Sequence, residues 1–213
     1  MRRADLKISE FTEQLSSDMP VPGGGGASAL CGALAAALGS MVAALTVGKK
    51  KYAEVQPEME KIREEAGRLA GELLDLIDQD AEAFRPLSQA YSLPRSTAEE
   101  KARREKIMEK ALLKAALSPL HIMEKAAEAL PMIKAAADRG SRLAVSDAGC
   151  AAAILKGALQ AAALNVTVNT RLMKDRGKAE ELNRRTEGIL SGCLPELENI
   201  YSSVSDALAG RGK

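Results

Sequence analysis

The sequence predicts an all-α protein, a single-domain antiparallel helical bundle over residues 1–213. Apolar residues recur at steps of three and four along most of the chain, and no alternating pattern long enough for a strand occurs. Aromatic residues make up 2% of the chain and Trp is absent, so the core must be packed from Ala, Leu, Ile, Val and Met. Such small side chains fill space only where helices approach closely, which favours a bundle.

The first half of the chain is expected to form three helices. A short amphipathic helix is predicted over 8–15, and an Ala-rich helix follows the glycines at 23–26 and ends near Gly48. A long amphipathic helix is predicted over 56–91. It should bend at Pro86, because proline lacks the N–H that a helix interior needs.

The second half contains further helices, whose ends are indicated by prolines, glycines and capping residues. Ser96 and Glu99 have the spacing of a capping box, which predicts a helix that starts there and continues through Leu117. Proline at 119 bends or restarts it. The remaining helices are expected over 131–140, from 147 to about 174 with Ser146 as its cap, and after Gly177 to near Leu208.

An uncharged block from Pro20 to Val47 is the most informative part of the sequence. Its four consecutive glycines, 23–26, have a large conformational entropy to lose on folding. A glycine-rich loop at a helix start directs several backbone N–H groups to one point, which suits an anion or an electron-rich heteroatom. The block therefore predicts a functional glycine-rich loop before a buried Ala-rich helix.

Other interpretations of this block remain open. The stretch 27–47 is long enough to span a bilayer, but it is mostly Ala, Gly and Ser and has no aromatic belt. Gly24, Gly26 and Ala29 fit the dinucleotide pattern G-x-G-x-x-A, although the residues before them do not resemble a buried strand. The glycines could also form a purely structural turn.

The net charge, the cysteines and the N-terminal segment argue against several classes of function. The net charge of +1 and the scarcity of aromatic side chains argue against a nucleic-acid partner. Cys31, Cys150 and Cys193 are far apart in sequence and form no metal or redox pattern, so no metal site is expected. The segment MRRADLKISEF lacks the apolar stretch of a signal peptide. We expect a cytoplasmic protein without a membrane partner.

A carboxylate in the apolar stripe of the helix over 56–91 is the leading catalytic candidate. Asp80 falls between Ile77 and Phe84 of that stripe, whereas Asp78 points almost oppositely, onto the solvated face. Burying a carboxylate is costly unless it is paired or serves a purpose, and desolvation raises its pKa toward the range useful for proton transfer. Asp80 is thus either a general acid–base or half of a buried salt bridge.

Polar residues on later helices are weaker candidates. Ser146 and Asp147 resemble any capped helix start, so a structural role is open. Asn165 and Asn169 are four apart and share one face of an apolar helix, where their amides need partners from a heterocyclic substrate or a neighbouring helix end. His121 is expected to be structural or exposed.

Several segments, in matching order and spacing over most of the chain, carry a resemblance to a known family. They are the P-x-P-G-G-G run with its Ala-rich helix, MVAALTVGKK (41–50), IDQDAEAF (77–84), SDAGCAA (146–152), and Asn165 followed by Asn169. In these the chain resembles the cyclodeaminase/cyclohydrolase family of folate enzymes. The family usually has serine directly after the three glycines. This chain has Gly26 there, with Ser28 two residues later.

The resemblance implies a homodimer or larger assembly and one-carbon chemistry on tetrahydrofolate. The reaction is either conversion of 5-formiminotetrahydrofolate to 5,10-methenyltetrahydrofolate with release of ammonia, or hydrolysis of that product to 10-formyltetrahydrofolate. Asp80 occupies the family's acid–base position. No cofactor beyond the folate is implied, because folate itself carries the carbon. Apolar faces around 27–47 and 151–163 also predict self-association, with the site near a subunit boundary.

The resemblance further implies a set of substrate contacts. The glycines would let the pterin or the one-carbon centre approach backbone N–H groups, and Asp147 could bind the pterin's amidine-like edge as a second catalytic carboxylate. Asn165 and Asn169 would orient the ring, and Lys49 would attract the glutamate tail. The full set of expected contacts is Gly23, Gly24, Gly25, Ser28, Lys49, Asp78, Ser146, Asn165 and Asn169.

Two questions stay open at the level of sequence. Nothing fixes which folate reaction dominates, although the missing formiminotransferase domain slightly favours the cyclohydrolase. The alternative is a non-catalytic helical module that binds folate or another protein. Such a module would explain a bundle and a dimer, but not Asp80 in an apolar stripe together with four glycines.

Overall fold

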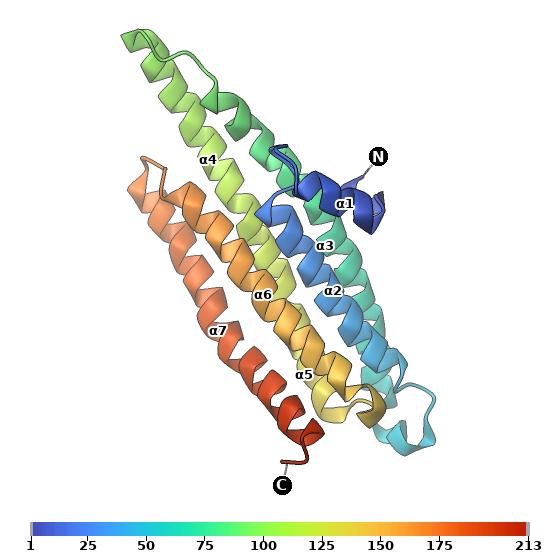
Figure 1. Cartoon of the computed structure of the whole chain (residues 1–213). Coiled ribbons are helices and arrows are strands. Elements are labelled where there is room, and N and C mark those ends of the chain that lie inside the picture. The colour runs from blue at the N-terminus through green and yellow to red at the C-terminus, as the bar shows by residue number, and fades with distance from the viewer. Residues whose placement is uncertain (1, 212–213) are drawn as a thin grey trace.

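The computed structural model describes residues 2–211 and confirms the all-α prediction, since those residues contain no strand (Figure 1). The α-helices are α1 (Ile8–Leu15), α2 (Gly24–Ala44), α3 (Gln56–Tyr91), α4 (Ala98–Ala127), α5 (Ala129–Arg139), α6 (Val145–Thr170) and α7 (Arg176–Leu208). Short 3-10 turns lie at η1 (Arg3–Asp5), η2 (Lys50–Val55) and η3 (Arg142–Ala144).

The two Ala-rich helices, α2 and α6, lie side by side at the centre of the bundle (Figure 1). They run antiparallel, because Gly24 at the start of α2 lies beside Asn165 near the end of α6. Every buried residue of α2 except Val42 is Ala, Gly or Ser. Helices with such small side chains can pack at short interaxial distances, so the scarcity of aromatics is matched by close packing.

Helices α3 and α4 form a long antiparallel pair that projects beyond the start of α2 (Figure 1). The apolar stripe expected on α3 faces the core: Ile62, Ala66, Leu69, Leu73, Leu76, Ile77 and Leu87 are buried, and Phe84 is partly buried against them. The predicted bounds of this helix, 56–91, are confirmed.

Several expected helix boundaries differ from the observed ones, among them the end of α2, which lies at Ala44 and not near Gly48. The capping box of α4 uses Thr97 and Glu100, one position later than expected. The helix also continues through Pro119 to its end at Ala127. Helix α6 begins at Val145 without a side-chain cap, so Ser146 lies inside its first turn. Helix ends are the least regular part of a helix, and local signals locate them only to within a few residues.

Two stretches are long and apolar enough to cross a membrane by length and composition, Gly24–Ala44 and Arg142–Thr170. Half of the first window and 44% of the second are buried inside the bundle. The core helices of water-soluble proteins pass the same test, so this property carries little weight by itself.

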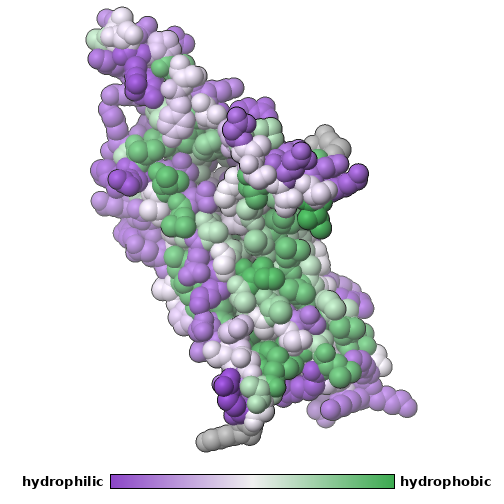
Figure 2. Space-filling model, viewed as in Figure 1, coloured by the Kyte–Doolittle hydropathy of each residue, from purple (hydrophilic) through white to green (hydrophobic). Residues whose placement is uncertain are grey.

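An apolar strip covers the outer faces of α2 and α6, and Figure 2 shows apolar residues gathered over α2 on this face. We define the α2–α6 strip by its large exposed side chains, which are 42–72% accessible. They are Leu34, Met41, Leu45, Leu164, Val168 and Leu172. Large exposed apolar side chains gathered on one face are unusual on an isolated soluble domain.

Candidate active site

The glycine run forms the first turn of α2 instead of the expected loop. Gly23 is the N-cap, with extended backbone angles, and α2 begins at Gly24. Within residues 2–211, positive φ angles occur only at Gly48 and Gly210. The glycines at 23–26 therefore have backbone conformations that other residues can also adopt.

The reason for two of these glycines is steric. A Cβ on Gly24 would lie 2.7 Å from Nδ2 of Asn165, and a Cβ on Gly25 would lie 2.6 Å from Oδ1 of Asp80. Real Cβ atoms essentially never approach another heavy atom within 3.0 Å. A Cβ on Gly26 would meet its nearest neighbour, Pro22, at 3.4 Å. Glycine thus leaves the room in which an aspartate and an asparagine side chain close onto the backbone.

Asp80 lies in the apolar stripe of α3, as expected, and faces the start of α2. The Ser118 hydroxyl donates a 2.9 Å hydrogen bond to its Oδ1, and the Gly26 backbone N–H also donates to the carboxyl group. Burial raises the pKa of Asp80, and these two hydrogen bonds lower it in part. Asp80 keeps some exposure to solvent. No Lys or Arg forms a salt bridge with it in the described chain, so the ion-pair alternative is not realised.

The two asparagines lie together on α6, opposite the glycine turn. The Asn165 amide donates to the Ala161 carbonyl at 2.8 Å. The Asn169 amide donates to the carbonyl oxygens of Ala115 at 3.0 Å and of Asn165 at 2.8 Å. Because both acceptors are carbonyls, the NH2 group of Asn169 must face them and its Oδ1 must face away. The expected shared face is confirmed, and a helix carbonyl supplies one partner.

Two expected contacts are engaged in structural interactions. The buried Ser28 hydroxyl donates to the Gly25 carbonyl at 2.7 Å, so it does not replace the family's serine in the site. Asp78 accepts two hydrogen bonds from the Arg3 backbone N–H, at 3.2 and 3.0 Å, and one from the Arg3 guanidinium at 2.9 Å. It therefore belongs to a partly exposed ion pair on the solvated face of α3 where it was expected.

A second group of expected site residues lies at the opposite end of α2. Lys49 donates from Nζ to the Ser141 hydroxyl at 3.0 Å, while Ser146 and Asp147 lie in the first turn of α6. Since α2 spans 21 residues, about 30 Å separates this end from Gly24. Within one subunit, the expected contacts therefore fall into two clusters.

Ser118 is a site residue that sequence reasoning missed. It lies on α4, 38 positions from its partner Asp80. A single serine in a long amphipathic helix forms no sequence pattern that predicts a functional role. The one unusual feature of Ser118 is that it precedes a proline inside the helix.

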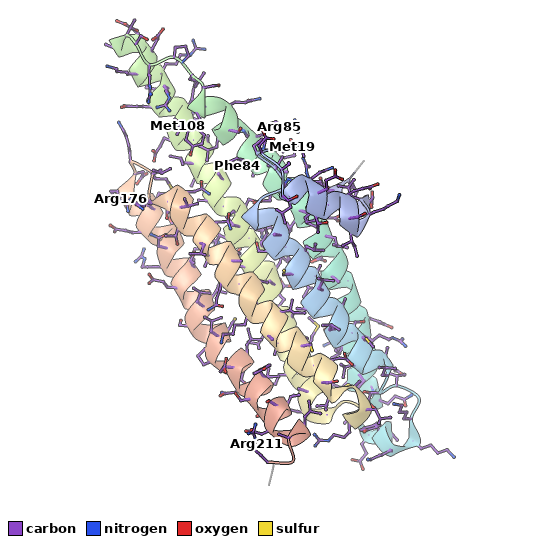
Figure 3. The ribbon with its side chains drawn as sticks, in the orientation of Figure 1. Met19, Phe84, Arg85, Met108, Arg176 and Arg211 are labelled. Carbon is purple, nitrogen blue, oxygen red and sulfur yellow. The ribbon has the colours of Figure 1, made fainter. Side chains whose placement is uncertain are left out.

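Apolar side chains accompany the site at this end of the bundle. Phe84 lies one turn after Asp80 on α3, and Phe84 and Met108 pack against the core with part of their surface exposed. Figure 3 places these two side chains at the projecting end of α3 and α4, with Met19 in the segment that leads into α2. This end of the bundle thus combines a carboxyl group and amide oxygens with partly exposed apolar side chains, and ligand sites commonly pair a few polar groups with apolar surface.

The N-terminal turn of α2 adds backbone donors. The first intrahelical hydrogen bond runs from the Ala27 N–H to the Gly23 carbonyl at 2.9 Å, so the N–H groups of Gly24 and Gly25 precede the helical ladder. The positive end of the helix dipole also lies here and favours negative charge. A buried carboxyl group beside such donors can move a proton while the donors stabilise a developing oxyanion.

Comparisons with known proteins give matches over most of the chain. The sequence model of the family described as formiminotransferase-cyclodeaminase matches residues 7–188. A methenyltetrahydrofolate cyclohydrolase of Methylorubrum extorquens is 41% identical over 92% of this chain and 95% of its own length. A formimidoyltransferase-cyclodeaminase of Mus musculus is 30% identical over 94% of this chain, which spans 37% of that longer protein.

The fold has a solved counterpart. The crystal structure of a formiminotetrahydrofolate cyclodeaminase from Thermotoga maritima superposes with a TM-score of 0.78 at 29% identity, covering 94% of this chain and 98% of that one. The match of the family model over 7–188, together with these relatives, shows that the chain belongs to the formiminotransferase-cyclodeaminase family.

Proposed function

We propose that this protein is an enzyme of one-carbon folate metabolism that acts on the carbon bridging N5 and N10 of tetrahydrofolate, and that its main reaction is hydrolysis of 5,10-methenyltetrahydrofolate to 10-formyltetrahydrofolate. The observation that carries the proposal is the Asp80 carboxyl group, held by Ser118 and the start of α2. The 41% identical cyclohydrolase supports the choice of reaction.

Asp80 acts as the proton carrier in this proposal. Its raised pKa makes the ionised form a stronger base than an exposed carboxylate, and its charge attracts the cationic bridging carbon of the substrate. Asp80 takes a proton from water as the water oxygen bonds to that carbon. It then delivers this proton to N5 as the carbon–N5 bond breaks. The hydroxyl proton leaves to solvent, so a formyl group stays on N10 and one proton is released overall.

The second candidate is the cyclodeaminase reaction, which the family's description and the Thermotoga maritima protein favour. Here N10 attacks the carbon of the protonated formimino group, whose nitrogen already carries two hydrogens, and Asp80 accepts the N10 proton. Asp80 then donates a proton to the departing nitrogen, which leaves as ammonia. Both reactions pass through a tetrahedral carbon between N5 and N10, so one proton carrier in one place serves either.

Asn165 and Asn169 orient the pterin ring in this proposal. Their NH2 groups are committed to carbonyl oxygens. The amide oxygens therefore remain as acceptors for the N–H groups of the ring. Asp147 and Ser146, at the other end of α2, take no part in chemistry at Asp80 of the same subunit, because helix length separates them.

The active assembly in this proposal is a homodimer formed through the α2–α6 strip. The strip is about 30 Å long and two helices, or about 20 Å, wide, so its footprint of about 600 Å² approaches the roughly 800 Å² per partner of a standard interface. The α2 part carries no charge from Ala27 to Val47, and a second copy presents the same apolar surface. An antiparallel pairing places Lys49 of one copy toward Gly24 of the other, where it can attract the glutamate tail.

Purified protein offered each folate separately tests the reaction. Absorbance of methenyltetrahydrofolate should fall faster than in buffer when that compound is supplied, and should rise when 5-formiminotetrahydrofolate is supplied and the deaminase reaction operates. No change with either folate would refute the proposed function. The cytoplasmic location and the absence of a cofactor beyond folate stay predictions.

A further inference from the structure

The proline inside α4 frees a carbonyl that the site uses. Proline has no N–H, so the carbonyl four residues earlier loses its helical partner. For Pro119 that carbonyl belongs to Ala115, and it accepts the hydrogen bond from Asn169 at 3.0 Å. Asn169 is buried, with 7% of its surface accessible, so its amide could not turn to water for this bond.

The other interior prolines show that this use is specific. Pro86 in α3 and Pro195 in α7 free the carbonyl oxygens of Glu82 and Ser191 in the same way. Among the described residues, neither of these oxygens accepts a side-chain hydrogen bond. Only the proline of α4 is coupled to a side chain of the site.

The residue just before this proline holds the other key side chain. Ser118 donates from its hydroxyl to Oδ1 of Asp80 at 2.9 Å. Two adjacent residues of α4 therefore act on two neighbouring helices. Ser118 contacts α3 directly, and Pro119 leaves free the Ala115 carbonyl that contacts α6. The two residues that it holds, Asp80 and Asn169, come from helices on either side of α4.

We propose that Ser118 and Pro119 are positioning residues of the active site, with Ser118 orienting the Asp80 carboxylate and Pro119 fixing the Asn169 amide by releasing the Ala115 carbonyl. The proposal rests on the proposed folate reaction for its effect on turnover. Its structural part concerns the protein without substrate and can be tested separately.

The proline variant separates positioning from stability. In Pro119→Ala the restored N–H competes with Asn169 for the Ala115 carbonyl. Alanine is also the better helix former, so the melting temperature should stay the same or rise. KM for the folate should nevertheless rise about tenfold, as expected when one ring contact loses its orientation. Pro195→Ala is the matched control and should leave KM unchanged.

Removing the Ser118 hydroxyl should change the pKa of Asp80. The Ser118 hydroxyl stabilises the charged form of Asp80 and so lowers its pKa. Ser118→Ala should therefore move the acidic limb of the kcat/KM profile to higher pH. Ser118→Thr keeps the hydroxyl and should restore the wild-type profile, while Ser191→Ala, at an exposed serine of α7, is the control.

Two measurements without substrate keep this proposal independent of the folate reaction. Carboxyl NMR should show Asp80 titrating at higher pH in Ser118→Ala than in wild type. Side-chain amide NMR should show faster hydrogen exchange of Asn169 in Pro119→Ala. If both signals match the wild type, the positioning roles are refuted. If both shift while neither folate is turned over, the positioning roles stand and the proposed reaction fails.

Discussion

The carboxyl group of Asp80 occupies the space where a side chain on Gly25 would begin, with Oδ1 2.6 Å from the position of a Cβ there. The two residues are 55 positions apart and come from different helices. Their contact places the acid–base candidate against the first turn of α2, within reach of the Gly26 N–H. The proposed chemistry depends on this contact.

Asp80→Asn should abolish most activity while leaving the fold intact. The amide keeps the shape and accepts hydrogen bonds, but it cannot carry the proton. General acid–base catalysis contributes roughly a hundredfold to ten-thousandfold in rate, so kcat should fall at least about a hundredfold and folate binding should change much less. Steady-state kinetics and thermal shift with the folate measure both.

Asp78→Asn is the control for that substitution. It weakens a partly exposed ion pair with Arg3, so a small loss of stability is expected with activity close to wild type. A large activity loss in Asp78→Asn together with an active Asp80→Asn would show that the acid–base residue was assigned to the wrong carboxylate.

Asp80 should also leave a signature in stability against pH. Burial raises its pKa in the folded state, so the folded protein binds this proton more tightly than the unfolded chain. The stabilising contribution is complete below the unfolded pKa and is lost as pH rises through the folded pKa. Asparagine does not titrate. Asp80→Asn should therefore gain unfolding free energy relative to wild type as pH rises above 3.8, the ordinary pKa of an aspartate.

Urea denaturation of wild type and Asp80→Asn across that range provides the comparison. A difference that stays constant with pH, or that favours the variant only at acid pH, would mean that the Asp80 pKa is not raised by burial.

The glycines should differ sharply in their tolerance of alanine. Gly25→Ala forces Asp80 to move and should strongly reduce kcat, with a smaller effect on folding, because Asp80 keeps some exposure and can turn aside. Gly26→Ala meets only ordinary contacts, and at Gly23 nothing lies within 4 Å of a Cβ. Both should stay active. Activity and melting temperature should be measured for all three variants. A fully active Gly25→Ala would show that the contact between Gly25 and Asp80 is irrelevant to catalysis.

The α2–α6 strip should hold a dimer. Light scattering of the wild type should give twice the 22.5 kDa chain mass at micromolar concentration. Leu34→Glu places a charge in the strip and should produce monomers, because burying an unpaired charge is costly. Leu208→Glu, at an exposed leucine of α7 outside the strip, should remain dimeric. A monomeric wild type would overturn the dimer.

The sequence alone determined the helices and the central position of the Ala-rich segments. Apolar periodicity predicted α1 and α3 at their observed bounds, because side chains three and four apart share one helix face. The same periodicity placed Asp80 in the buried stripe of α3. Local signals were less reliable at helix ends, where Ser146 and Ser96 were expected as caps and neither is one.

Only the tertiary structure decided which of the expected site residues meet. Asp80, Gly25 and Asn165 come together because α2 lies antiparallel to α6 and beside α3. The same antiparallel packing carries Lys49 and Asp147 to the far end. Ser118 entered the site through the register between α3 and α4. Contacts between helices depend on their relative translation and rotation, which no pattern within a single helix encodes.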